Sequence, residues 1–179
     1  MANPQLPNWT EEVSTGTPVV SVMFSPSSPG RTFAITSDGR LFTTDEVKNR
    51  GSWSETGTWR TSSGDDVRQL AVNSQHDGRL YAITEASVAR STTYGISWRE
   101  IGSGSLPESE FNSIVAHPTE AHTLFLGADS GVYMSIDEGD TWTPYDDDLP
   151  NAEVLQIFFE NGYLYAVTHG RGLWRRRPC

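Results

Sequence analysis

Residues 124–142 read LFLGADSGVYMSIDEGDTW: two short apolar segments, then a polar turn that ends in a tryptophan. The same ending recurs along the chain, because Trp9, Trp53, Trp98 and Trp142 are spaced by 44, 45 and 44 residues and each precedes a polar, strand-compatible segment. Self-similarity at a fixed period is the mark of a repeat architecture. Three matched intervals in a row predict four related units.

Each unit also carries three short segments rich in β-branched and aromatic residues. The first begins at Val19, Val67, Phe111 and Val154, the second at Thr32, Leu80, Leu124 and Leu164, and the third at Leu41, Val88, Val132 and Leu173. Gly, Pro, Ser or Asp bounds each segment, which is typical of strands, and no stretch shows a sustained helical period. A unit is therefore predicted to contain four short strands, A to D, with D starting at the tryptophan. This is the size of one propeller blade.

The predicted fold is all-β: a four-bladed β-propeller of four-stranded antiparallel blades, forming a single domain over residues 1–179. The blades are expected at about 17–57, 66–103, 111–147 and 152–179 plus 8–13. The chain opens with a lone D segment and closes after a C segment, so the N-terminal strand is expected to complete the last blade and protect its edge. This order predicts a complete unit. The same strand could instead complete the last blade of a second chain, giving an eight-bladed swapped dimer.

Two turns carry a recognisable motif. Residues 135–142, SIDEGDTW, fit the pattern S-x-D-x-G-x-T-W, and residues 91–98, STTYGISW, fit it with Thr in place of Asp. The chain therefore resembles the Asp-box, or bacterial neuraminidase repeat, β-propeller superfamily, which includes sialidases, xyloglucanase-like glycosidases, sortilin-type receptors and a photosystem II assembly factor. The resemblance implies a structural role for the box residues: Ser135, Asp137, Gly139, Thr141 and Trp142, with Ser91, Gly95, Ser97 and Trp98.

Composition narrows the classes of partner. The net charge is −10 and the pI is near 4.7, which argues against binding to nucleic acid or anionic lipid because both are negatively charged. No apolar run approaches 18 residues, so no membrane insertion is expected. The N-terminus lacks the basic and apolar regions of a secretory signal, which predicts a cytoplasmic protein. The single cysteine, Cys179, excludes an internal disulfide.

Catalytic patterns are missing from the sequence. It contains no G-x-S-x-G, no H-E-x-x-H, no P-loop and no Cys/His zinc spacing, so no catalytic residues, metal site or cofactor are predicted. The early F/Y-R-I-P motif of sialidases is absent. A xyloglucanase-type enzyme needs two carboxylates across a long cleft, which one small propeller does not offer, although a dimer could.

A propeller gathers its B–C and D–A loops around one mouth, where ligands usually bind. Here these loops are mostly acidic, with Arg40, His169 and Arg171 as basic exceptions. The predicted ligand- or partner-binding residues are Asp38, Arg40, Asp65, Asp66, Asp129, His169 and Arg171. Such a rim fits a basic peptide or a cation.

The function that the sequence favours is a non-catalytic binding or scaffold module for protein–protein interaction, because rigid rings with variable loops commonly serve as docking surfaces. Its partner is predicted to be another protein. A carbohydrate-binding, lectin-like propeller is the alternative, with Trp59 and Trp174 as candidate sugar platforms. A glycosidase-related domain is a further alternative.

Overall fold

The computed structural model describes residues 11–45, 52–145 and 147–178. These residues form fifteen β-strands and no helix, arranged as separate antiparallel sheets of consecutive strands. None of the described residues forms a helix that could cross a membrane. The all-β prediction is confirmed.

The four sheets are called blades 1 to 4 in chain order. Blade 1 contains β1 (Val19–Phe24), β2 (Arg31–Thr36), β3 (Arg40–Asp45) and β4 (Ser54–Thr58). Blade 2 contains β5 (Gln69–Val72), β6 (Leu80–Ile83), β7 (Val88–Ser91) and β8 (Arg99–Ile101). Blade 3 contains β9 (Phe111–Ala116), β10 (Leu124–Ala128), β11 (Gly131–Ser135) and β12 (Thr143–Pro144). Blade 4 contains β13 (Val154–Glu160), β14 (Tyr163–Thr168) and β15 (Gly172–Arg176). The outer strands β4, β8 and β12 each begin one residue after a repeat tryptophan, as the period predicts.

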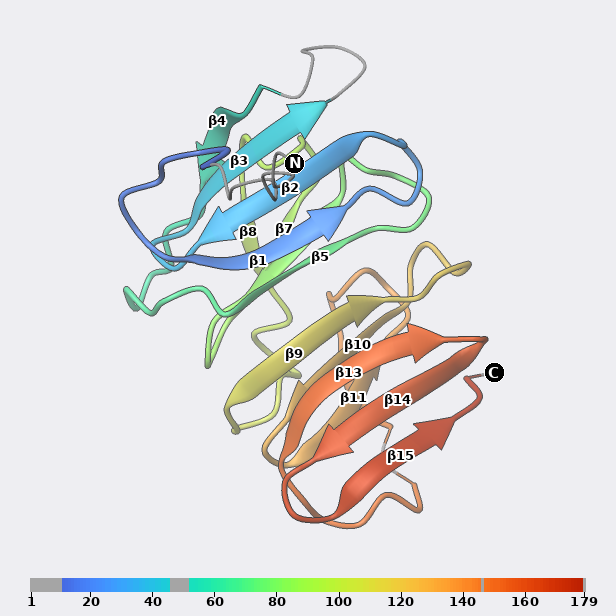
Figure 1. Cartoon of the computed structure of the whole chain (residues 1–179). Helices are drawn as coiled ribbons and strands as arrows, with labels where there is room; N and C mark the ends of the chain where they lie inside the picture. The colour runs from blue at the N-terminus through green and yellow to red at the C-terminus, as the bar shows by residue number, and fades with distance from the viewer. Residues whose placement is uncertain (1–10, 46–51, 146, 179) are drawn as a thin grey trace, which may run out of the picture.

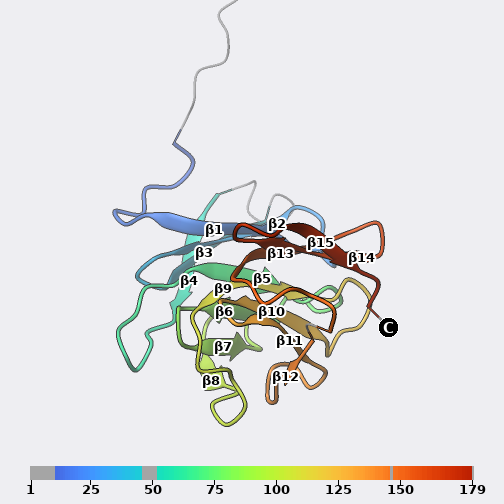
Figure 2. The ribbon, with the colours of Figure 1, turned by 90° about the horizontal axis from the view of Figure 1, so that it is seen from below.

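The four sheets form an arc in chain order. Their inner strands β1, β5, β9 and β13 lie next to one another in that order, with blades 1 and 4 at the two ends (Figures 1 and 2). Three apolar layers fill the spaces between successive blades. Phe33 and Leu70 belong to the layer between blades 1 and 2, Tyr81 and Ile114 to the next, and Phe125 and Ile157 to the last.

Every blade therefore uses its two faces differently. One face, here called the leading face, packs against the preceding blade, and the other, the trailing face, packs against the following blade. The alternation of side chains along a strand makes this possible, because residues i and i+2 share one face. In β5, for example, Leu70 faces blade 1 while Ala71 faces blade 3.

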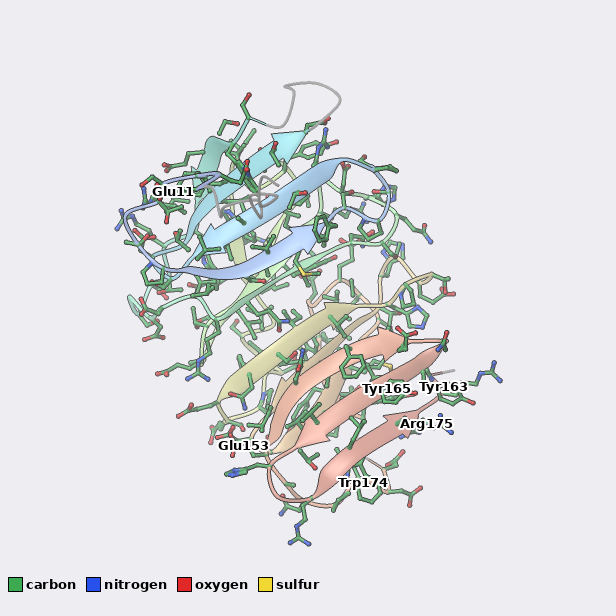
Figure 3. The ribbon with its side chains drawn as sticks, viewed as in Figure 1. Glu11, Glu153, Tyr163, Tyr165, Trp174 and Arg175 are labelled. Carbon is green, nitrogen blue, oxygen red and sulfur yellow. The ribbon has the colours of Figure 1, made fainter. Side chains whose placement is uncertain are left out.

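The last blade differs from the expected one. Its sheet has three strands in the described residues, and residues 11–13 form no strand beside β15. Residues 8–10 of the predicted fourth strand lie outside the described residues. Figure 3 shows Glu11 beside blade 1 and Trp174 on blade 4, at opposite ends of the view. The physical reason is a local anchor, because the Arg40 guanidinium binds the carbonyl of Thr15 and holds this segment against blade 1.

Candidate binding face

The B–C and D–A loops meet at one end of the blades. Backbone hydrogen bonds join them across blade boundaries: the Val67 N–H donates to the Ser37 carbonyl at 2.8 Å, and the Phe111 N–H donates to the Glu85 carbonyl at 2.8 Å. In blade 4 the His169 N–H donates to the Glu153 carbonyl at 2.9 Å. Backbone bonds therefore link the rim loops of blades 1, 2 and 3 to one another, and a further bond joins the two rim loops of blade 4.

In three of the four blades, a threonine at the end of the second strand shapes the B–C turn. Thr36 Oγ1 accepts from the Arg40 N–H at 3.0 Å, and Thr168 Oγ1 donates to the Gly172 carbonyl at 2.8 Å. Thr84 Oγ1 accepts from the Ser87 N–H at 3.0 Å. All three threonines are buried. A short hydroxyl side chain that bonds nearby backbone favours a turn, so the sequence fixes these loops locally.

Two of the predicted rim residues, Asp38 and Arg40, form one cluster on blade 1. Arg40 Nε lies 3.3 Å from Asp38 Oδ2, and Asp38 Oδ1 also accepts from Thr36 and Thr17. The hydrogen bond from Thr36, together with those from Thr17 and the charge of Arg40, lowers the pKa of Asp38 despite some desolvation. Arg40 therefore contacts both Asp38 and Thr15. Its guanidinium helps to hold the N-terminal segment against blade 1 and also contributes positive charge to the rim.

Arg68 is a rim residue outside the predicted binding set. Its guanidinium donates to the Phe111 carbonyl at 2.9 Å and to Asn112 Oδ1 at 3.2 Å. It also forms ion pairs with Glu85 at 3.1 Å and Glu110 at 3.0 Å. An arginine at the start of the inner strand, opposite acidic loops on both sides, was the available sequence signal. Arg68 offsets part of the negative charge between blades 2 and 3.

Asp129 joins this network through Asn112, whose Nδ2 donates to Asp129 Oδ1 at 2.7 Å. Asp65 and Asp66 lie on the loop between blades 1 and 2, where Asp65 accepts from the Ser63 hydroxyl at 2.5 Å and Asp66 is exposed. The structure therefore brings Asp129 together with Arg68 and keeps Asp65 and Asp66 on a separate loop.

His169 and Arg171 lie on the B–C loop of blade 4. His169 Nδ1 is 2.9 Å from Glu153 Oε2, so this imidazole has a carboxylate partner at the rim. The Arg171 side chain is exposed, and its carbonyl accepts from Trp174 Nε1 at 2.8 Å. The two basic side chains of this loop therefore differ: His169 contacts a carboxylate, and Arg171 is exposed to solvent.

The rim surrounds a hollow of about 420 Å³ where the four inner strands converge. It is lined by Val20, Ser21, Arg68, Gln69, Asn112, Ser113, Leu155, Gln156 and Val167. Strand-to-strand hydrogen bonds close its wall: Gln69 Oε1 accepts from the Ile114 N–H at 2.7 Å, and Ser113 Oγ accepts from the Ile157 N–H at 3.1 Å. The hollow is open and mixed in polarity. No cluster of three or more potential metal ligands occurs among the described residues.

The residues predicted to have a structural role lie away from the rim, in the C–D hairpins. Ser135 Oγ accepts from the Gly139 N–H at 2.8 Å, Asp137 Oδ1 accepts from the Thr141 N–H at 2.8 Å, and Trp142 is buried with its Nε1 donating to the Gly139 carbonyl at 3.0 Å. Desolvation alone would raise the pKa of Asp137, but hydrogen bonds from Thr141 and Ser135 outweigh it and lower that pKa.

The hairpin of blade 2 repeats this geometry with an uncharged residue. Ser91 Oγ accepts from the Gly95 N–H at 2.9 Å, and Thr93 Oγ1, in the place of Asp137, accepts from the Ser97 N–H at 3.0 Å. Gly95 has φ of +84° and a Cβ there would lie 2.0 Å from a Leu41 methyl carbon, so glycine is required both for the turn and for the close approach.

The tryptophans considered as sugar platforms have different environments. Trp59 is buried and stacks on Trp98 with ring centroids 6.1 Å apart, so it has no free face for a sugar and this prediction is wrong. Trp174 is partly exposed and lines a cavity of about 380 Å³ between blades 3 and 4.

Antiparallel sheets arranged about a shared hollow, with loops gathered at one mouth, define a β-propeller. The chain belongs to the DUF6242 beta propeller domain family, whose family model matches residues 4–170. No curated protein matches this sequence.

Solved structures show the same architecture. The GH74 xyloglucanase from Xanthomonas campestris superposes with a TM-score of 0.68 at 18% identity, covering 95% of this chain and 30% of the enzyme. A structure described as YCF48 bound to D1 peptide gives 0.68 at 14% identity, covering 94% of this chain and 54% of that one. The computationally designed Ika4 protein gives 0.63 at 12% identity, covering 95% and 99% of the two chains. The chain thus spans less than a third of the GH74 enzyme and about half of YCF48. At these identities the likeness shows the fold alone.

Proposed function

We propose that this propeller is a non-catalytic protein-binding module whose acidic mouth takes a basic segment of a partner protein. The observation that carries this proposal is the charge of the rim. Asp38, Asp65, Asp66, Glu85, Glu110, Asp129 and Glu153 all lie on loops at the mouth, and the whole chain has a net charge of −10. A surface of one sign raises the association rate and the selectivity for a partner of the opposite sign.

The rigidity of the rim supports the same function. The loops are held by inter-blade backbone bonds and by buried threonines, so little conformational entropy would be lost when a segment binds. One structural neighbour, YCF48, is described with a bound peptide, which gives a precedent for a peptide on a propeller of this shape.

The carbohydrate alternative has less support. The burial of Trp59 removes one of its two candidate platforms, and Trp174 lies between blades rather than at the mouth. The GH74 neighbours are enzymes of which this chain spans 22–30%, so their activity has no direct bearing on the rim described above.

We also infer that the hairpins at residues 91–98 and 135–142 are Asp-box turns with a structural role. Their support is local geometry, because in both hairpins a serine hydroxyl binds a glycine N–H and the next polar side chain binds the backbone near the tryptophan.

The experiment compares labelled peptides by fluorescence anisotropy. A lysine- and arginine-rich peptide should bind more tightly than a neutral or glutamate-rich peptide of equal length, and its affinity should fall as salt rises. Asp66→Lys and Asp129→Lys should each weaken binding about tenfold. Glu120→Lys is the matched control, because Glu120 is exposed on an A–B turn away from the mouth and the charge change is the same.

Equal affinity for the neutral and basic peptides, or equal loss in all three variants, would contradict the proposal. Binding or hydrolysis of xyloglucan oligosaccharides without peptide binding would instead favour the carbohydrate alternative.

A further inference from the structure

The two end blades leave faces uncovered that every other blade buries. Strand pairing places Val22, Leu70, Ile114 and Ile157 at one equivalent position, because each lies opposite the matching residue of the second strand. The last three are fully buried against the preceding blade. Val22 is 50% exposed and Phe24, two residues on, is 74% exposed. The leading face of blade 1 therefore carries, along β1, apolar side chains at positions that the other blades bury against a neighbour.

The trailing face of blade 4 shows the complementary pattern. Phe33, Tyr81, Phe125 and Tyr165 share an equivalent position on the second strand, and the first three are fully buried. Tyr165 is only half-buried, stacking on Phe158 at 5.1 Å, and Leu173 beside it is 60% exposed. Figure 3 shows Tyr163, Tyr165 and Arg175 together on this face. A closed four-bladed ring would cover these side chains with blade 1.

Polar groups repeat the same pattern. The Gln69 and Ser113 side chains accept the N–H of Ile114 and Ile157 in the following blade. Gln156 occupies the equivalent place in blade 4 and is exposed, and by the same rule its acceptor would receive the Val22 N–H of a following blade 1. The hydrogen bond that Gln156 lacks in blade 4 thus has a matching donor, the Val22 N–H of blade 1.

An arginine on the third strand also repeats between blades 2 and 4. Arg90 lies opposite Tyr81 and reaches the C–D hairpin of blade 3, where it pairs with Glu138 at 3.5 Å and Asp140 at 3.3 Å. Arg175 lies opposite Tyr165 in blade 4 and sits 4.8 Å from the ring of Tyr163. A blade 1 placed after blade 4 would set the end of β3 near Arg175, as the end of β11 lies near Arg90.

The edge of blade 4 lacks an outer strand in the described residues, and a cavity marks the place of that strand's tryptophan. Trp142 is buried between blades 2 and 3, and its backbone N–H donates to Ser105 Oγ at 2.9 Å in the loop after β8. The corresponding space between blades 3 and 4 is the cavity of about 380 Å³, lined by Tyr145, Leu149 and Trp174. Trp9 is the repeat tryptophan that precedes the first strand of blade 1 in the sequence.

We propose that two copies of this chain close one ring head to tail: blade 1 of each copy packs on blade 4 of the other, and residues 8–13 of each complete the other's β15 edge. Trp9 then fills the cavity between blades 3 and 4. Glu11 aligns with Glu55 and Glu100, which lie opposite Phe42 and Ala89, so it falls opposite Trp174 and beside Arg175. A head-to-tail contact forms a closed assembly when its rotation closes, and here two identical contacts close it.

The test is the mass in solution, by light scattering on a sizing column over a range of concentrations. A dimer of twice 19.8 kDa is expected, and a chain that stays at 19.8 kDa throughout overturns the proposal. Larger open assemblies overturn it too, because the two contacts would then not close.

Variants locate the contact. Val22→Glu with Phe24→Glu should weaken dimerisation at least about 30-fold, as expected for a hot spot, and leave the fold intact because both side chains are exposed. Ile96→Glu with Ile136→Glu is the matched control, since these apolar residues are each 68% exposed on C–D hairpins outside the contact, and it should remain dimeric. Trp9→Ala should weaken the dimer without changing the circular dichroism spectrum.

Mixing separates head-to-tail pairing from other dimers. The mixing is done at a concentration above the dissociation constant of the unchanged dimer and below that of the variants. A chain carrying Val22→Glu and Phe24→Glu and a chain carrying Leu173→Glu and Arg175→Glu are then each expected to be monomeric, yet one intact contact remains when they are combined. A heterodimer should therefore form on mixing. Its absence, with both variants folded, or a dimer that survives in the Val22/Phe24 variant alone, overturns the proposal.

Discussion

Phe125 and Tyr165 occupy the same position of the repeat but have different environments. Phe125 lies at the centre of the layer between blades 3 and 4, in edge contact with Phe159 at 5.6 Å and Tyr145 at 5.2 Å. Tyr165 lies on the trailing face of blade 4, half-buried and stacked on Phe158. The repeat therefore specifies an aromatic residue at this position in both blades, while burial depends on whether a neighbouring blade follows.

The largest expected effect comes from truncating these two side chains. Phe125→Ala should lower the free energy of unfolding by about 3–5 kcal/mol, because it opens a cavity in a closed layer. Tyr165→Ala should cost under about 1 kcal/mol when the protein is dilute enough to be monomeric, because water already reaches this face. Urea unfolding followed by tryptophan fluorescence measures both. Equal losses would show that the two faces are equally covered and would remove the distinction between inner and end blades.

A second comparison concerns two acids in the hairpin of blade 3. Glu138 is largely buried and contacts Arg79, Arg90 and His122, whereas Asp140 is half-exposed beside Arg99 at 3.1 Å. Glu138→Gln should destabilise by about 2 kcal/mol, since it leaves two arginines without their shared charge. Asp140→Asn should cost under about 0.5 kcal/mol, as for other exposed pairs. Thermal unfolding of the two variants makes the comparison, and equally small losses would mean that solvent screens Glu138 as well.

The smallest effect distinguishes the two motif hairpins. Hydrogen bonds hold the pKa of Asp137 below its ordinary value of 3.8, so its ionised form stabilises the folded state above that pH and the contribution is lost as the pH falls through the lowered pKa. Thr93 in the hairpin of blade 2 does not titrate. Asp137→Thr should therefore cost about 1 kcal/mol at pH 7 and less at low pH. Unfolding at pH 7 and near pH 3 tests this, with Thr93→Ala as the control whose cost should not change with pH.

Much of the fold follows from the sequence because the same residue types recur at the same positions of each repeat. The tryptophan period places β4, β8 and β12, and glycine at positive φ fixes the C–D hairpins of blades 2 and 3. The rim residues could be assigned to loops in the same way. Their grouping could not, because Arg68 meets Glu85 and Glu110 only after three loops converge. The cytoplasmic location and the partner stay predictions.

The sequence by itself determined the all-β class, the four units and the acidic loops, since these depend on local propensity, period and charge. Only the tertiary structure decided that Trp59 is buried, that Arg40 holds residues 15–17 against blade 1, and that the faces of blades 1 and 4 do not cover each other. The physical reason is that burial is a property of pairs of surfaces. The repeat determines which side chains each blade presents to its neighbours, but the angle between blades determines whether the first and last blades meet.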